Sequence, residues 1–453
     1  IAHSGSKSFV EAVKAAKGNL SEGLIGQFGV GFYSVFMVSD RVDVYTAGED
    51  GKGHHWSCDG SENFTIEDFD KKERGTKIVA RLKKECDEFS KAWRVKSILE
   101  KYSAYVDFPI ELNGEKIGTR RAIWLKSKSE LKKEDYDEFF KFHTHSSEGP
   151  IDCLHFKADA PVELNALIYI PAANPERLGF GKTECEVALY CKKVLIDPRP
   201  EGLFPEWMRF AKGVIDSADI PLNISRESMQ DSALVRKLGR VVTKRFLKRL
   251  AEIAKGDPEK YAKFFKNFGM FIKEGAATDF DNREELSKLL RFESSAMKEG
   301  EFASLDDYVS RMKDGQKEIF YAAAQDRAAI ESGPYLEAFA SRGLEVLFMY
   351  EPIDTFLAGN LGEFSGKPFA SIDSAGISLS ETPKGADESG ALSKEEADEL
   401  KNWIQETLGS EKASEVLTSG RLVDSPAAAL NADSLTPQMR IMLKAMNPDS
   451  KMP

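Results

Sequence analysis

The residues that could do chemistry gather first in a glycine-rich turn. Residues 24–34 read LIGQFGVGFYS, and the spacing of Gly26, Gly29 and Gly31 lets successive backbone N–H groups turn toward one anion. An apolar run that predicts a helix follows at once, and a helix start adds its dipole to such a site. The spacing matches neither the phosphate loop of nucleoside triphosphatases nor the dinucleotide-binding fingerprint. The turn therefore indicates phosphate binding, with an ordinary tight turn as the alternative.

Two separate motifs resemble one protein family. The first runs over residues 1–46, with SGSKSF ahead of the glycine turn, and resembles the ATP-lid segment of the ninety-kilodalton heat-shock protein chaperones. The second, DIPLNISRESMQ at residues 219–230, resembles the catalytic loop of that family's middle domain. The short linker at 118–122, where eukaryotic cytosolic members carry a long charged insertion, resembles the bacterial or mitochondrial type. The likeness continues through residues 264–269, 289–295 and 345–350 and so covers nearly the whole chain.

The resemblance implies ATP and Mg²⁺ as cofactors and assigns the nucleotide contacts. Ser4 and Gly5 correspond to the flexible lid over the nucleotide. Thr76 corresponds to a threonine near the adenine, with a plain strand threonine as the alternative reading. The glycine turn would bind the β- and γ-phosphates through the backbone N–H groups of Gly26, Gln27, Phe28, Gly29, Val30, Gly31 and Phe32.

The second motif supplies the catalytic residues that the resemblance implies. Arg226 would reach the transferring phosphoryl group from another domain, so that docking of the domains gates hydrolysis. Asn223 and Gln230 correspond to residues that shape the same loop, and Glu227 would orient it. A surface arginine in a salt bridge is the alternative for Arg226.

Part of the family's ATP site has no counterpart in this chain. The general-base Glu, the Mg²⁺-ligand Asn and the adenine-reading Asp of the family all lie upstream of the position of Ile1. We therefore expect no metal ligand in these residues, and we expect the chain alone to be a poor ATPase even if its parent is competent. His3 stands where many members have Lys or Arg, and a neutral imidazole lacks their constant charge.

A chain of 453 residues predicts several domains. We expect a multidomain protein with α+β and α/β layers, divided in the way that the resemblance implies. Residues 1–117 would form the C-terminal part of a GHKL-type ATP-binding α/β sandwich, residues 122–378 an α/β middle domain, and residues 391–453 the start of a C-terminal α/β dimerisation domain. The chain ends before the family's dimer helices.

Hydrophobic periodicity predicts the elements that position these motifs. The run 32–38 predicts a buried helix, and an Asn-Gly pair at 113–114 predicts a hairpin over 110–117. The residues 187–196 read as one strand, and 380–392 as a linker. Further strands are expected at 41–46, 55–58, 76–82, 164–170, 319–323 and 346–349, and helices at 96–105, 133–142, 234–250, 259–271, 283–290 and 394–408.

Composition narrows the classes of partner. A net charge of −11 argues against a nucleic-acid binder, and no apolar run approaches the ~20 residues of a membrane span. The basic residues of 234–250 read as a solvated helix face. The five cysteines form no CxxC pair, which favours reduced thiols. The histidines at 54–55 and 143–145, with Cys153 and His155, lack the spacing of a zinc site.

The sequence thus predicts an ATP-dependent chaperone of partly folded client proteins, linked to the stress response. The resemblance implies a homodimer in the parent, possible co-chaperones, and a bacterial cytoplasm or a mitochondrial matrix as its location. Trp124 and Trp207 are candidate client contacts, with buried core as the alternative. Two rivals stay open: another ATPase of the same nucleotide fold (a topoisomerase, a mismatch-repair ATPase or a histidine kinase) and a scaffold that needs no nucleotide.

Overall fold

A computed structural model describes residues 31–431, apart from 49–50, 71–72, 119, 180, 221–231, 378, 380–391, 411, 420 and 423–424. The chain forms two compact units. The first runs to residue 172 and also includes 183–204 and 209–243, and the second holds 173–182, 205–208 and the residues from 244 onward. Both units mix helices and sheets, which confirms the predicted mixed α/β multidomain class.

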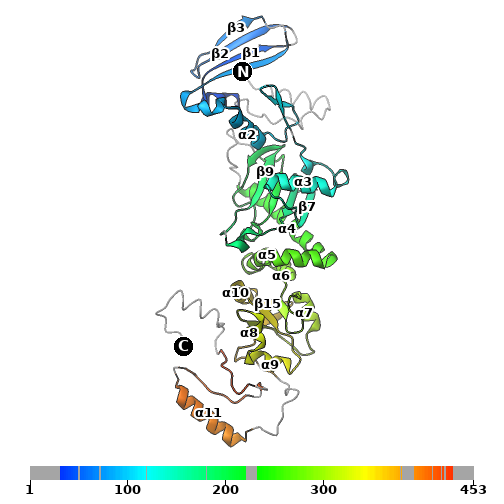
Figure 1. Ribbon diagram of the computed structural model, residues 1–453, viewed down its shortest axis with the longest axis vertical. Helices are drawn as coiled ribbons and strands as arrows, with labels where there is room; N and C mark the ends of the chain where they lie inside the picture. The colour runs from blue at the N-terminus through cyan, green and yellow to red at the C-terminus, as the bar shows by residue number, and fades with distance from the viewer. Residues whose placement is uncertain are drawn as a thin grey trace. The chain divides into compact units, whose positions relative to one another are not determined.

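The first sheet of the first unit has four strands in the order β3-β2-β1-β4, and Figure 1 shows β3, β2 and β1 side by side in blue. The 3₁₀ helix η2 (Gly31–Met37) packs Phe32, Val35 and Phe36 on Val42, Val44 and Trp56 of this sheet. The expected strands are confirmed as β1 (Ser39–Ala47), β2 (Gly53–Cys58) and β4 (Gly75–Leu82), and β3 (Thr65–Phe69) adds an edge.

The prediction of a buried helix at 32–38 is wrong in its burial and its type. No residue of η2 is buried, and Met37 is 74% exposed. The physical reason is geometric, because this run is apolar on all sides while the sheet can cover only the side that carries Phe32, Val35 and Phe36.

A helix and a hairpin connect this sheet to the next. The 3₁₀ helix η3 (Lys84–Ser90) precedes α2 (Ala92–Tyr102), which begins and ends a few residues earlier than expected. The hairpin is confirmed as β5 (Ile110–Leu112) and β6 (Glu115–Ile117). Asn113 and Gly114 have φ values of 53° and 82°, which is why an Asn-Gly pair turns the chain here.

The second sheet of this unit has five strands in the order β10-β9-β11-β8-β7. Its bounds are β7 (Asp152–Ala158), β8 (Leu164–Ile170), β9 (Glu186–Cys191), β10 (Val194–Asp197) and β11 (Lys212–Asp216). The helix α3 (Lys133–Thr144) and the 3₁₀ turns η4 (Ile123–Leu125) and η5 (Lys128–Glu130) accompany it. Aromatic side chains form its core, among them Tyr105, Trp124, Phe139, Phe140, Tyr169 and Tyr190.

The single strand predicted at 187–196 is wrong. The chain turns at Lys192 and Lys193, whose φ values are 49° and 69°, and returns as β10 antiparallel to β9. Two lysines carry no turn signal, and a contact from elsewhere in the chain holds this turn: the Lys193 N–H donates to Asp216 Oδ2 at 2.9 Å.

The second unit carries another five-stranded sheet, in the order β12-β14-β13-β16-β15. The long helices α4 (Ser232–Gly256) and α5 (Pro258–Thr278) precede it in the chain. The Asp257 carboxylate caps α5 by accepting from the Lys260 N–H at 3.1 Å. The expected strand β13 (Ile319–Ala323) is confirmed, as are α6 (Arg283–Leu289), β14 (Leu347–Met349) and α11 (Lys394–Leu408).

The remaining elements of this unit are short. They are η6 (Pro175–Leu178), η7 (Glu206–Met208), β12 (Glu293–Ser294), α7 (Leu305–Arg311), α8 (Arg327–Glu331), α9 (Pro334–Ala340), α10 (Pro352–Leu361), β15 (Glu363–Phe364) and β16 (Lys367–Ser371). Of the predicted linker at 380–392, only Leu392 is among the described residues. Within the described part of the chain, no helix combines the length and the apolar content that a membrane crossing requires.

The two tryptophans considered as client contacts lie in the cores, so that the buried-core reading is confirmed for both and neither is a client contact. Trp124 and Trp207 are each 1% exposed. The indole N–H of Trp124 donates to Asp216 Oδ2 at 3.0 Å, and that of Trp207 donates to Asp279 Oδ2 at 2.9 Å. Burial with a satisfied N–H makes each ring a structural anchor and leaves no surface for a client.

Candidate functional site

One face of the first sheet carries the predicted nucleotide residues that the structure describes. Val44 of β1 pairs with Trp56 and with Ile78, and two residues along, Thr46 pairs with Thr76. Since side chains alternate along a strand, these residues share one face. The Phe32 ring lies 5.8 Å from the Trp56 ring, so η2 covers the same face. Thr76 and Phe32, which lie 44 positions apart, are therefore brought to one side of the sheet.

The hydroxyl groups of Thr46 and Thr76 lie 2.8 Å apart at the exposed surface of this face. Gly31 begins η2, and a Cβ added to it would meet no atom of the described residues within 4 Å. The other predicted nucleotide residues lie outside the described part of the chain: Ser4, Gly5, Gly26, Gln27, Phe28, Gly29 and Val30.

The predicted catalytic residues Asn223, Arg226 and Gln230 lie in 221–231, which is also outside the described residues. The chain on either side of them is described. β11 is buried at four of its five positions, Ile220 after it is 3% exposed, and α4 begins at Ser232. The predicted loop therefore connects the end of a buried strand to the start of a long helix.

Residues between β11 and the predicted loop form hydrogen bonds with Glu163, which precedes β8, and with Tyr190 of β9. The Ser217 hydroxyl donates to the Glu163 carbonyl oxygen at 2.6 Å, and the Ser217 N–H donates to the Tyr190 carbonyl at 3.1 Å. The Asp219 carboxylate in turn accepts from the Glu163 N–H at 2.8 Å. The approach to the loop is thus fixed by side-chain and backbone bonds.

Asp216, the last residue of β11, is an anchor that the sequence reading missed. Its carboxylate is buried and accepts from the Trp124 indole and from the Lys193 backbone. Burial raises the pKa of Asp216, and the hydrogen bonds from Trp124 and Lys193 oppose that shift. An acidic residue ending the apolar run GVID was the available signal, because a buried carboxylate needs donors.

Two histidines, His143 and His155, support the core of the second sheet. His155 Nε2 donates to the Trp124 carbonyl at 3.1 Å, which leaves Nδ1 to accept from the Tyr136 hydroxyl at 2.8 Å. Burial lowers the pKa of His155 and of His143, whose Nε2 donates to the Gly213 carbonyl. Nowhere in the described residues do three or more His, Cys, Asp or Glu side chains gather in a way that could hold a metal ion.

This chain is similar to known proteins over most of its length. The model of the family described as "Hsp90 protein" matches residues 113–452. The chain belongs to the Hsp90 family. The chaperone protein HtpG of Desulfitobacterium hafniense is 46% identical over 451 residues, covering 99% of this chain and 73% of that protein. HtpG of Desulfotalea psychrophila is 48% identical over 438 residues, covering 96% and 70%.

A mitochondrial relative is also similar. The TNF receptor-associated protein 1 homolog of Dictyostelium discoideum is 40% identical over 453 residues, covering 99% of this chain and 63% of that protein. The predicted family is thus confirmed, and the chain is a molecular chaperone of the Hsp90 type. The rival assignments to a topoisomerase, a mismatch-repair ATPase or a histidine kinase are set aside by this Hsp90 membership.

Proposed function

We propose that this Hsp90 chaperone couples ATP hydrolysis to the docking of its ATP-binding and middle domains, and so remodels partly folded client proteins. The single observation that supports it is the shared sheet face, on which η2 directly after the glycine turn and Thr76 lie together. Residues 26–32 would bind the phosphates through their N–H groups, and Thr76 would lie near the adenine. ATP, when bound, supplies the phosphoanhydride bond that is hydrolysed.

The described residues include groups that suit a nucleotide but no cluster that suits its metal ion. The Thr76 hydroxyl is exposed on this face, and Gly31 at the start of η2 carries no side chain that could cover it. No group of acidic or histidine side chains in the described residues suits Mg²⁺. We infer that the Mg²⁺ ligand, the general base and the adenine-reading carboxylate are contributed by residues outside 31–431, in a domain of the GHKL type.

Arg226 is proposed as the cation on the transferring phosphoryl group, with Asn223 and Gln230 shaping its loop. A guanidinium presents a planar fork to phosphate oxygens and keeps its charge at every physiological pH. Arg226 stands in the chain between β11 and α4, and hydrogen bonds of Ser217 fix the described residues that precede its motif.

The proposal is tested by replacing Arg226 in the complete protein and measuring ATP binding and hydrolysis separately. We expect Arg226→Ala to lower kcat about 10²–10³-fold and to leave the Kd for ATP within about twofold. Arg226→Lys should recover only part of kcat, because a point charge lacks the fork. Arg236→Ala, an exposed arginine on α4, is the matched control and should change neither value. A protein that binds no ATP would be the nucleotide-independent scaffold instead.

The remaining assignments follow as proposals from the family. We infer three domains at 1–117, 122–378 and 391–453, a homodimer of the complete protein, and binding of unfolded clients with the help of co-chaperones. The bacterial HtpG relatives favour a cytoplasmic location, with the mitochondrial matrix as the alternative given by the mitochondrial relatives.

A further inference from the structure

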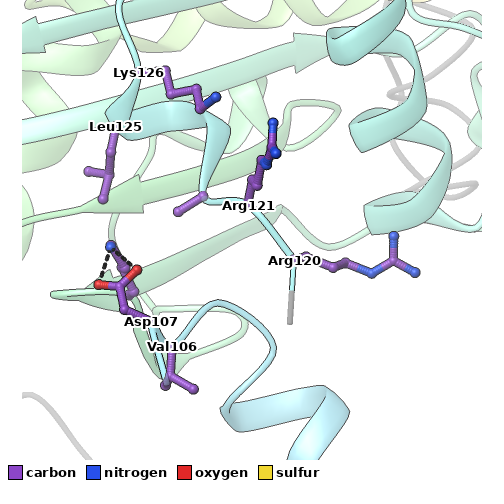
Figure 2. Close-up of a pocket in the computed structure, with 8 residues that line it drawn as sticks. Val106, Asp107, Arg120, Arg121, Leu125 and Lys126 are labelled. Carbon is purple, nitrogen blue, oxygen red and sulfur yellow. Dashed lines mark hydrogen bonds and ion pairs between the residues drawn. The ribbon is translucent and has the colours of Figure 1, made fainter. Parts of the chain in front are cut away.

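A basic pocket lies in the first unit beside the loop that carries η4 (Figure 2). It has a volume of about 490 Å³, within the ~300–1,000 Å³ of small-molecule sites. Four cationic side chains and one carboxylate line it, in a chain whose net charge is −11. Its lining residues are Val106, Asp107, Arg120, Arg121, Ala122, Leu125, Lys126 and Lys193.

Two of the four cations are already engaged. Lys193 Nζ lies 2.6 and 2.5 Å from the two carboxylate oxygens of Asp107, so these two charges cancel. The Arg120 guanidinium lies 3.3 Å from the centre of the Phe142 ring, and Figure 2 shows it directed away from Asp107. In the described residues, neither Arg121 nor Lys126 forms a hydrogen bond or an ion pair with a side chain, although the charge of Lys126, after the hydrogen bonds from Ser127, contributes to lowering the pKa of Glu130. These two cations are therefore available to a ligand.

The backbone that carries these two charges is fixed. Between them, Ile123 and Trp124 are 8% and 1% exposed. The Trp124 carbonyl accepts from His155 at 3.1 Å, and the Lys126 N–H donates to the Ile123 carbonyl at 3.1 Å. Arg120 is held in the same way, because its N–H donates to the Ala104 carbonyl at 2.7 Å. A ligand at Arg121 and Lys126 would therefore order only their side chains, which keeps the entropic cost of binding low.

Apolar side chains stand beside the unpaired cations. Val106 and Ala122 are half-buried in the pocket wall, and Leu125 is 39% exposed. An inorganic ion would use only the charges, whereas a ligand with an organic part would also cover these side chains.

We propose that this pocket binds a small organic phosphate. The phosphate would accept from the Arg121 guanidinium and the Lys126 ammonium group, and the organic part would lie against Val106, Ala122 and Leu125. This site goes beyond the proposed chaperone cycle, because it shares no residue with the nucleotide face or with the loop at 221–231.

The test is a titration of the full chain with phenyl phosphate, followed by NMR of the Val106 and Leu125 methyl groups. We expect saturable shifts at both methyl groups, and at least about tenfold weaker binding in the Arg121→Ala/Lys126→Ala double variant. Lys128→Ala, an exposed lysine two residues beyond the pocket, is the matched control and should bind as the native chain does. Equal urea midpoints for all variants would show that folding is unchanged.

Three results would overturn the proposal. Shifts of equal strength with inorganic phosphate would mean an adventitious ion only. Phenyl phosphate binding that survives in the double variant would place it elsewhere, such as at the nucleotide face. Saturation by a glutamate-rich peptide but not by phenyl phosphate would identify the pocket as a contact for an acidic protein segment.

Discussion

The two sheets of the first unit differ in how completely they are covered. Every residue of β8 is buried except Asn165, whereas β4 of the four-stranded sheet has no buried residue. The same contrast holds between like strands, since the inner strand β1 is buried at five of nine positions, a smaller share than in the inner strand β8, and the edge strand β7 of the second sheet is buried at two of seven, more than the edge strand β4. The sheet next to the proposed nucleotide turn is therefore less deeply buried than the sheet that leads into the proposed catalytic loop. Local opening costs least where little apolar surface is buried. The comparison predicts that the first sheet opens before the second.

The largest effect is expected from an added methyl group in the second sheet. Gly213 in β11 has φ +139°, and a Cβ there would lie 2.1 Å from the Leu167 carbonyl oxygen of β8. Gly213→Ala should lower the free energy of unfolding of this sheet by at least ~3 kcal/mol. Hydrogen exchange of the β8 amides measures it. Gly31→Ala, whose added Cβ meets no atom within the part of the chain that the structure describes, is the control and should leave the exchange of β1 unchanged. Equal effects of the two substitutions would contradict the difference in packing between the two sheets.

A matched pair of tryptophans gives the next largest effect. Trp124 is 1% exposed and donates to Asp216, whereas Trp56 is 8% exposed beneath the half-buried side chains of η2. Trp124→Ala should cost ~3–5 kcal/mol in the second sheet. Trp56→Ala should cost the first sheet less, about 2 kcal/mol, because Phe32 and Phe36 can move into the space. Hydrogen exchange of β8 and β1 compares them, and a larger loss at Trp56 would contradict the difference in packing.

Two buried aspartates should respond to pH in opposite directions. Burial raises the pKa of Asp216, so its contribution to stability is present below the unfolded value of ~3.9 and is lost as pH rises through the folded pKa. Burial would also raise the pKa of Asp43 in the first sheet, but hydrogen bonds from Ser57, His55 and Arg41 outweigh it and lower that pKa. The contribution of Asp43 is therefore present above ~3.9 and is lost as pH falls through its folded pKa.

The measurement is the difference in unfolding free energy between the native chain and each Asp→Asn variant from pH 3 to 8. Relative to Asp216→Asn, the native chain should lose stability as pH rises. Relative to Asp43→Asn, it should gain stability over the same range. Curves of the same sign for both variants would show that the two carboxylates share one environment, against the contrast between the sheets.

Local sequence signals predicted most of the elements, and distant contacts account for the errors. The strands at 164–170 and 319–323 and the helix at 394–408 have the bounds that were predicted, because each is a strong periodic run between clear end signals. The β9–β10 turn was missed because a hydrogen bond from Lys193 to Asp216, 23 residues away, holds two lysines at positive φ. No pattern in a single sequence encodes such a contact.

The candidate site, too, was predicted in part from local motifs, and its remaining contacts are visible only in the folded chain. The motifs named the nucleotide turn and the Arg226 loop, and the structure adds a common face for Phe32 and Thr76 that only strand register could reveal. The anchors Asp216 and Lys193, and the pairing of Lys193 with Asp107 over 86 positions, come from the folded chain. For Trp124 and Trp207 the sequence left core and interface open, since both places favour large aromatic residues, and the structure places both in cores.

The smallest effect on stability should come from Thr76, and it is the sharpest test of the nucleotide face. Thr76→Val removes an exposed hydrogen bond to Thr46 and keeps the branched side chain that suits a strand, so the first sheet should change by less than ~0.5 kcal/mol. A loss of ATP affinity of about tenfold in the complete protein would then report on the ligand, since packing is unchanged. Thr46→Val removes the same hydrogen bond from the other side and serves as the control. If both variants weaken ATP binding equally, the hydroxyl pair acts as a unit; if neither does, Thr76 is an ordinary strand threonine and the nucleotide lies elsewhere.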